Sequence, residues 1–107
     1  LENIPTVIRM GAFDIDVRVV PDPQVNGKVV HGLWDGNTQT ISLDSNLATS
    51  ALAVNILLHE LYHAFYWFFE IDDDTSEERT VACLATGWST VIRDNPELIK
   101  WIQKGLK

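Results

Sequence analysis

The sequence predicts an α+β fold in which a small antiparallel sheet, built from N-terminal strands, packs on a long helix that two further helices follow. Up to residue 43, short runs of alternating apolar and polar residues are separated by Gly, Pro and Asn, which is typical of strands and turns. From residue 44 onward, apolar residues recur at helical spacing. With 107 residues, 46% of them hydrophobic, the chain has room for a single domain, 1–107, with a modest core.

The first two strands are expected on either side of Gly11, which would form the turn between them. In the second strand, residues 13–20, apolar side chains alternate with charged ones, so one face should be buried. The expected buried positions are Phe13, Ile15, Val17 and Val19. Two prolines then end this strand, and residues 24–28 around Asn26-Gly27 are expected to form a loop or a hairpin.

A further antiparallel pair of strands is expected before the first helix. Residues 29–34 are apolar enough for a strand, Asp35-Gly36-Asn37 is a strong turn signal, and residues 38–43 would be the partner strand. Ordinary antiparallel strands explain these residues without any function, and this is the default interpretation. The functional interpretation places the last strand at the edge of the sheet, where an extended peptide could add as one more strand. His31 is expected to be a surface or hydrogen-bonded residue rather than a metal ligand.

The longest helix is expected to begin after Asp44-Ser45-Asn46, which can cap it, and to continue past His63. This segment contains no Gly or Pro that would interrupt a helix. It is apolar nearly all round, so we expect it to be central and covered on several sides.

Two shorter helices should follow. Thr75 and Glu78 form a capping box for the first of them. Asn95 would cap the second, with Pro96 in its first turn, and Gly105 is a plausible end.

The long helix carries His59-Glu60-Leu61-Tyr62-His63, an HExxH motif. A helical residue and its fourth successor lie one above the other, about 6 Å apart along the axis, so His59 and His63 present both imidazoles to one point. Two neutral nitrogens placed in this way suit zinc, and Glu60 beside them is free to accept a proton from water. Since two of the three histidines have this spacing, a metal site is favoured over core histidines or a chance motif.

Catalytic zinc usually takes three protein ligands, so a third is expected outside the motif. The extended HExxHxxGxxH pattern is absent, which leaves Glu77, Glu78 and Asp72–Asp74 as candidates. We favour Glu77 because it shares a helical face with the apolar residues of its helix, whereas the capping box would engage Glu78. Both could instead be ordinary first-turn acids that face water. Glu77 reaches the zinc only if the first helix ends near Trp67 and the loop folds back.

The predicted reaction is zinc-dependent hydrolysis of a peptide bond in a protein substrate. Zinc held by the two histidines and Glu77 would polarise the scissile carbonyl, while Glu60 would take a proton from water and pass it to the leaving amine. Tyr62 or Tyr66 could supply a second donor to the carbonyl oxygen, although tyrosine in an apolar helix is more often a core residue. The alternative is a non-catalytic zinc-binding regulatory or protein-interaction module, because the chain is short for a protease.

The HExxH motif, followed by Glu77-Glu78-Arg79-Thr80-Val81-Ala82, resembles the compact zinc metallopeptidases of the gluzincin type, in particular the ImmA/IrrE-like proteins of phages and mobile elements. The similarity covers roughly residues 28–93. It implies a zincin-like domain, Glu77 as the third ligand with Val81 and Ala82 after it, and cleavage of repressor or regulator proteins. The family's acidic-Ala-Asn sequence is absent after Glu77, so the chain would be a divergent relative. The segment 84–97 is similar to small phage proteins with HExxH, which implies a phage or prophage origin.

Charge and composition limit the partners and the compartment. The net charge of −7 argues against binding to nucleic acid or an anionic membrane, so a basic or neutral partner is expected. Cys83 is the only cysteine, which excludes an internal disulfide and suits a reducing compartment. No stretch is long enough for a membrane span, and the residues from Leu1 onward lack a signal-peptide layout, so we expect a soluble, cytoplasmic protein, in the host cytoplasm if phage encoded. Because Leu1 is not Met, we expect that terminal residues were trimmed.

Overall fold

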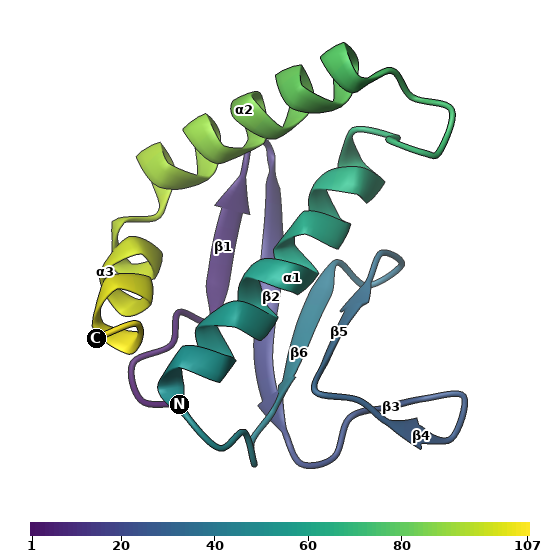
Figure 1. The fold of residues 1–107 in the computed structure, drawn as a ribbon. Helices are drawn as coiled ribbons and strands as arrows, with labels where there is room; N and C mark the ends of the chain where they lie inside the picture. The colour runs from purple at the N-terminus through teal and green to yellow at the C-terminus, as the bar shows by residue number, and fades with distance from the viewer.

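The computed structural model describes all 107 residues, with the strands first and the helices after them. A four-stranded sheet has the order β1 (Val7–Met10), β2 (Phe13–Val20), β6 (Thr40–Asp44) and β5 (Gly32–Asp35), and a separate hairpin consists of β3 (Gln24–Val25) and β4 (Lys28–Val29). The helices are α1 (Ser50–Phe68), α2 (Glu77–Asp94) and α3 (Pro96–Gly105). Figure 1 shows α1 lying across one face of the sheet, with α2 and α3 on the side of β1. The predicted α+β class is confirmed.

The prediction of an antiparallel sheet is wrong, because β2 and β6 pair in parallel, from Asp16 opposite Thr40 to Val20 opposite Asp44. After β2 the chain forms the β3–β4 hairpin and returns through β5, which places β6 between β2 and β5. β6 is therefore a central strand and β5 is an edge strand, so the interpretation that placed the last strand before α1 at the edge is wrong. Alternation along a strand indicates which face is buried, but it does not identify the neighbouring strand.

The expected strand over residues 29–34 is divided between β4 and β5, because each half pairs with a different partner. Between them, the Val30 amide donates to the Pro23 carbonyl at 2.8 Å, and the His31 carbonyl accepts from Asp44 at 2.9 Å. The hairpin turn predicted at Asn26-Gly27 is confirmed, since both residues have positive φ angles of 52° and 79°.

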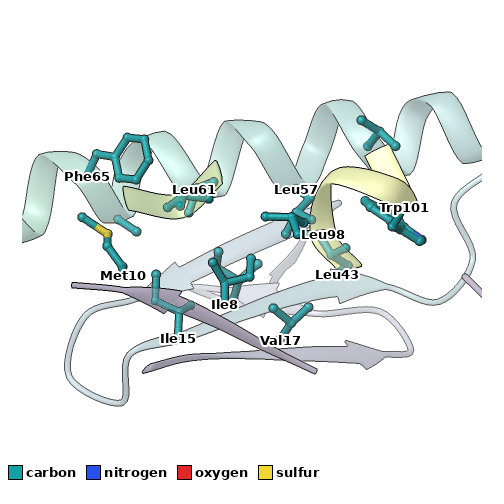
Figure 2. Close-up of a cluster of buried hydrophobic side chains, with 14 of the residues drawn as sticks. Ile8, Met10, Ile15, Val17, Leu43, Leu57, Leu61, Phe65, Leu98 and Trp101 are labelled. Atoms are coloured by element: carbon teal, nitrogen blue, oxygen red, sulfur yellow. The ribbon is translucent and has the colours of Figure 1, made fainter. Parts of the chain in front are cut away.

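The core lies between the sheet and the inner face of α1 (Figure 2). Its fully buried side chains include Ile8, Ile15, Ile41 and Leu43 from the strands, Leu57, Leu61 and Phe65 from α1, and Leu98 from α3. Of the expected buried face of β2, Ile15 and Val17 are buried. Phe13 and Val19 are exposed, because they lie near the two ends of the strand, where α1 covers less of the sheet; the Phe13 ring stacks on Phe68 at 4.9 Å.

The first helix begins later than expected. Its cap is Thr49, whose hydroxyl accepts from the amide of Leu52 at 3.1 Å. The carboxylate of Asp44 instead accepts from the amide of Asn46 at 3.0 Å, so it stabilises the turn before the helix. The outer side of α1 carries exposed large side chains. The expectation that this helix is covered on several sides is therefore wrong. None of the three helices combines the length and apolarity that a membrane span requires.

The capping box predicted for α2 is not formed. Ser76 is the cap, and its hydroxyl accepts from the amide of Arg79 at 3.2 Å. The hydroxyl of Thr75 accepts from the amide of Asp72 at 2.9 Å, within the loop that precedes the helix. One position therefore separates the predicted cap from the actual one, and Glu78 is not engaged in capping.

Asn95 and Pro96 stand at the start of α3 as expected, and α3 ends at Gly105. The side chain of Asn95 does not cap the helix. It accepts from the Arg9 amide at 2.7 Å and donates to the Arg9 carbonyl at 2.8 Å and to the Val91 carbonyl at 2.9 Å. This buried amide therefore joins β1 to the end of α2.

Candidate metal centre

The helix α1 brings His59 and His63 together, as the four-residue spacing predicts. Their Nε2 atoms are 3.2 Å apart, and their ring centroids are 5.0 Å apart. The side chain of His59 is 63% exposed, so a ligand can approach the pair from solvent. Both rings therefore direct a nitrogen to the same region outside the helix.

The separation of the two nitrogens fits a shared metal ion. Two nitrogens that each bind a tetrahedral zinc at about 2.0–2.1 Å lie about 3.3–3.4 Å apart. The observed distance of 3.2 Å between the Nε2 atoms is close to this value. It also suits a hydrogen bond between the rings, in which one Nε2 carries the proton. His59 and His63 therefore fit two of the ligands that a zinc ion needs.

Glu60 lies beside this pair and is the most deeply buried polar residue of α1, with 8% of its surface exposed. Its Oε2 atom is 3.9 Å from Nε2 of His59. The carboxylate packs against β5 at Gly32, where an added Cβ would lie 3.1 Å from Cγ of Glu60 and 2.5 Å from the Ile56 side chain. Gly32 thus lets the edge strand approach the carboxylate closely.

Glu77 is not brought to the histidine pair. It is an exposed residue in the first turn of α2, and nowhere in the structure do three or more His, Cys, Asp or Glu side chains form a cluster able to hold a metal ion. The residue of α2 that faces the histidines is Leu84, two turns later and about 10 Å further along the helix axis. The role of Glu77 as third ligand stays a prediction, as do those of Glu78 and Asp72–Asp74, which are also exposed.

The two histidines open into a surface cavity of about 330 Å³. Its lining consists of His59, Tyr62, His63, Tyr66 and Leu84. His31 is exposed and lies outside this cavity, in line with its expected position at the surface. Four of these residues belong to α1 and Leu84 belongs to α2, so the cavity lies between the two helices, and Glu60 is not among its lining residues.

Sequence analysis missed three residues that shape this site. Gly32 was treated only as part of a strand, although an isolated glycine inside a strand pattern indicates close backbone approach. Leu84 and Trp88 recur at helical spacing, which is typical of core residues, and both pack against the core cluster. Both are only partly buried, and the indole of Trp88 donates to the hydroxyl of Tyr62 at 3.0 Å.

Comparison of the chain with models of protein families, with curated proteins and with solved structures found no match.

Proposed function

We propose that this protein is a zinc-dependent peptidase of the zincin type. The proposal depends on one observation: the two Nε2 atoms lie at a metal-sharing distance, and a buried carboxylate stands next to them. His59 and His63 would hold the ion, and Glu77 is the proposed third ligand. Zinc supplies a Lewis acid that polarises the scissile carbonyl and activates water.

Glu60 is the general base in this proposal. Its Oε2 atom lies 3.9 Å from Nε2 of His59 and its side chain packs against Gly32 of β5, so it would take a proton from the attacking water and pass it to the leaving amine. Because Glu60 is largely buried, few water molecules compete for it, and its position relative to the histidines is restricted.

The expected substrate is an extended segment of a protein. The unpaired edge of β5 can add one more strand, and a peptide bound there would pass close to Glu60, which packs against Gly32 of the same strand. We further propose that the substrate is a repressor or regulator in the cytoplasm of a phage-infected or lysogenic host, because the HExxH segment resembles those of ImmA/IrrE-like proteins.

The test compares wild type with Glu60→Gln, both loaded with one equivalent of zinc, on a library of internally quenched peptides. The variant keeps the shape of the side chain but cannot accept the proton, so cleavage should fall by about 10²–10⁴-fold. Zinc content, measured by atomic emission after gel filtration, should remain one ion per chain in both proteins. Equal cleavage rates would contradict the role of Glu60, and absence of cleavage by the wild type would contradict the peptidase proposal.

A second candidate is a non-catalytic zinc-binding module that regulates or binds another protein. It is favoured by the position of Leu84, an apolar residue, where α2 comes closest to the histidine pair. The same experiment separates the two candidates, because such a module would bind zinc through His59 and His63 and cleave no peptide.

A further inference from the structure

The two tyrosines of the cavity differ in how they are held. The hydroxyl of Tyr62 accepts a hydrogen bond from Nε1 of Trp88 at 3.0 Å, between residues 26 positions apart in the chain. Tyr66 lines the same cavity and is equally exposed, at 42% against 40% for Tyr62, but its side chain makes no hydrogen bond with the protein. The structure therefore distinguishes two side chains that the sequence could not separate.

The chemistry of the indole determines the direction of this hydrogen bond. An indole N–H can only donate, so the oxygen of Tyr62 is the acceptor. A phenol that accepts through its oxygen keeps its own proton for another partner, and the hydroxyl of Tyr62 donates to no group of the protein. Accepting a hydrogen bond also makes this hydroxyl a stronger donor. Tyr62 thus offers an unused donor in the cavity that His59 and His63 line.

Packing restricts the ring that carries this hydroxyl. The Tyr62 ring meets Phe65 edge-on with centroids 5.9 Å apart, and Trp88 at 6.0 Å. Trp88 in turn meets Phe65 edge-on at 5.7 Å, and Phe65 is fully buried. Three mutually contacting rings, anchored in the core, therefore hold the phenol before any substrate arrives. A preorganised donor of this kind stabilises developing charge without further reorganisation.

We propose that Tyr62 is a catalytic residue that donates a hydrogen bond to the carbonyl oxygen of the scissile bond, and that Trp88 is its positioning residue. This inference depends on the proposed peptidase function. As water adds to the carbonyl carbon, negative charge develops on the carbonyl oxygen, and the hydrogen bond from Tyr62 strengthens. The proton stays on the phenol, so no bond of Tyr62 is broken.

A purely structural role is the competing explanation, since the same hydrogen bond also joins α2 to α1. The two explanations differ in what the loss of the hydroxyl would change. A structural link affects stability and leaves the turnover of the folded protein unchanged. A donor to the carbonyl oxygen affects kcat and leaves KM little changed, because the bond is strongest in the transition state.

The first measurement tests the hydrogen bond itself and needs no activity. The chain has four tryptophans, so a ¹⁵N–¹H spectrum should contain four indole cross-peaks, of which the one absent from Trp88→Phe belongs to Trp88. In Tyr62→Phe this cross-peak should move upfield, as expected for a lost hydrogen bond, while the other three stay in place. If the Trp88 cross-peak does not move, the proposed geometry is wrong.

The second measurement uses the zinc-loaded proteins and the peptide that the wild type cleaves fastest in the quenched library. Tyr62→Phe should lower kcat by about 10²-fold with KM little changed. Trp88→Phe keeps a ring against Phe65 but loses the N–H, and should lower kcat by about tenfold. Tyr66→Phe is the matched comparison and should lower kcat much less than Tyr62→Phe.

The outcomes separate this inference from the function on which it depends. If wild type cleaves the peptide and Tyr62→Phe has the same kcat, the role of Tyr62 is overturned while the peptidase proposal stands. The same conclusion follows if Tyr62→Phe and Tyr66→Phe lower kcat equally. If zinc-loaded wild type cleaves nothing, both proposals fall together. A selective loss of kcat in Tyr62→Phe, with unchanged zinc content, supports both.

Discussion

The three histidines of the chain lie in two different environments. His59 and His63 share a helical face and a cavity, whereas His31 is an exposed residue before the edge strand β5. Only the first two can place their nitrogens on one ion, since their Nε2 atoms are 3.2 Å apart. At the scale of single residues, zinc binding should therefore depend on two histidines and not on the third.

We expect wild type to bind one Zn²⁺ per chain, and His59→Ala or His63→Ala to weaken binding at least about 100-fold, because each removes one ligand from a small set. Isothermal titration with zinc measures this effect. His31→Ala is the matched control and should bind zinc as the wild type does. Equal affinities for all three variants would show that the HExxH helix does not hold the ion.

The proximity of the two histidines was predictable from the sequence, whereas the position of Glu77 relative to them was not. The approach of His59 to His63 follows from the helical repeat alone and needs no knowledge of the rest of the fold. The position of Glu77 depends on where α1 ends, how residues 69–76 turn and at what angle α2 crosses, and none of these is encoded locally. The sequence therefore indicated a shared face for Glu77 and Leu84 but not which of them would meet the histidines.

At the scale of secondary-structure elements, too, the sequence indicated the elements themselves but not how they meet. The strands β1, β2 and β6, the turn at Gly11 and the three helices were predicted from alternation, turn residues and helical spacing, whereas the expected strand over residues 29–34 is divided between β4 and β5. The parallel pairing of β2 with β6 was missed, because it joins residues 24 positions apart, such as Asp16 and Thr40, and alternation is identical for parallel and antiparallel neighbours. The cap of α1 was misplaced since several residues between Asp44 and Thr49 are equally good caps.

At the scale of elements, Asn95 joins three of them, since it stands at the start of α3. Its buried side-chain amide forms hydrogen bonds with the backbone N–H and carbonyl of Arg9 in β1 and with the carbonyl of Val91 in α2. Asn95→Ala should lower the free energy of unfolding by about 1–2 kcal/mol, because it leaves the part-buried amide and carbonyl of Arg9 without their side-chain partner. Urea denaturation followed by circular dichroism measures the change. Asn46→Ala, at an exposed asparagine, should differ from wild type by less than about 0.5 kcal/mol. Similar stabilities of the two variants would contradict this role.

At the scale of the whole molecule, α1 lies across one face of the four-stranded sheet (Figure 1). His59 and His63 are exposed residues of this helix. α1 buries Leu57, Leu61 and Phe65 against the strands, while its opposite side presents His59 and His63. The site is therefore open to solvent between β5 and α2, so a segment of another protein can reach it without any part of the fold moving aside.

The net charge of −7 should act on any substrate that approaches this open site. We compare a cleavable peptide extended by three lysines with the same peptide extended by three glutamates. At low salt the lysine peptide should have a kcat/KM roughly tenfold higher, because the acidic protein attracts it and repels the glutamate peptide. The ratio of the two kcat/KM values should fall toward one as NaCl is raised from about 0.01 M to about 1 M, because the Debye length falls from about 30 Å to about 3 Å. A peptide extended by three serines is the control, and its kcat/KM should change little with salt. If the glutamate peptide is cleaved as fast as the lysine peptide at low salt, the charge of the protein does not select its substrates.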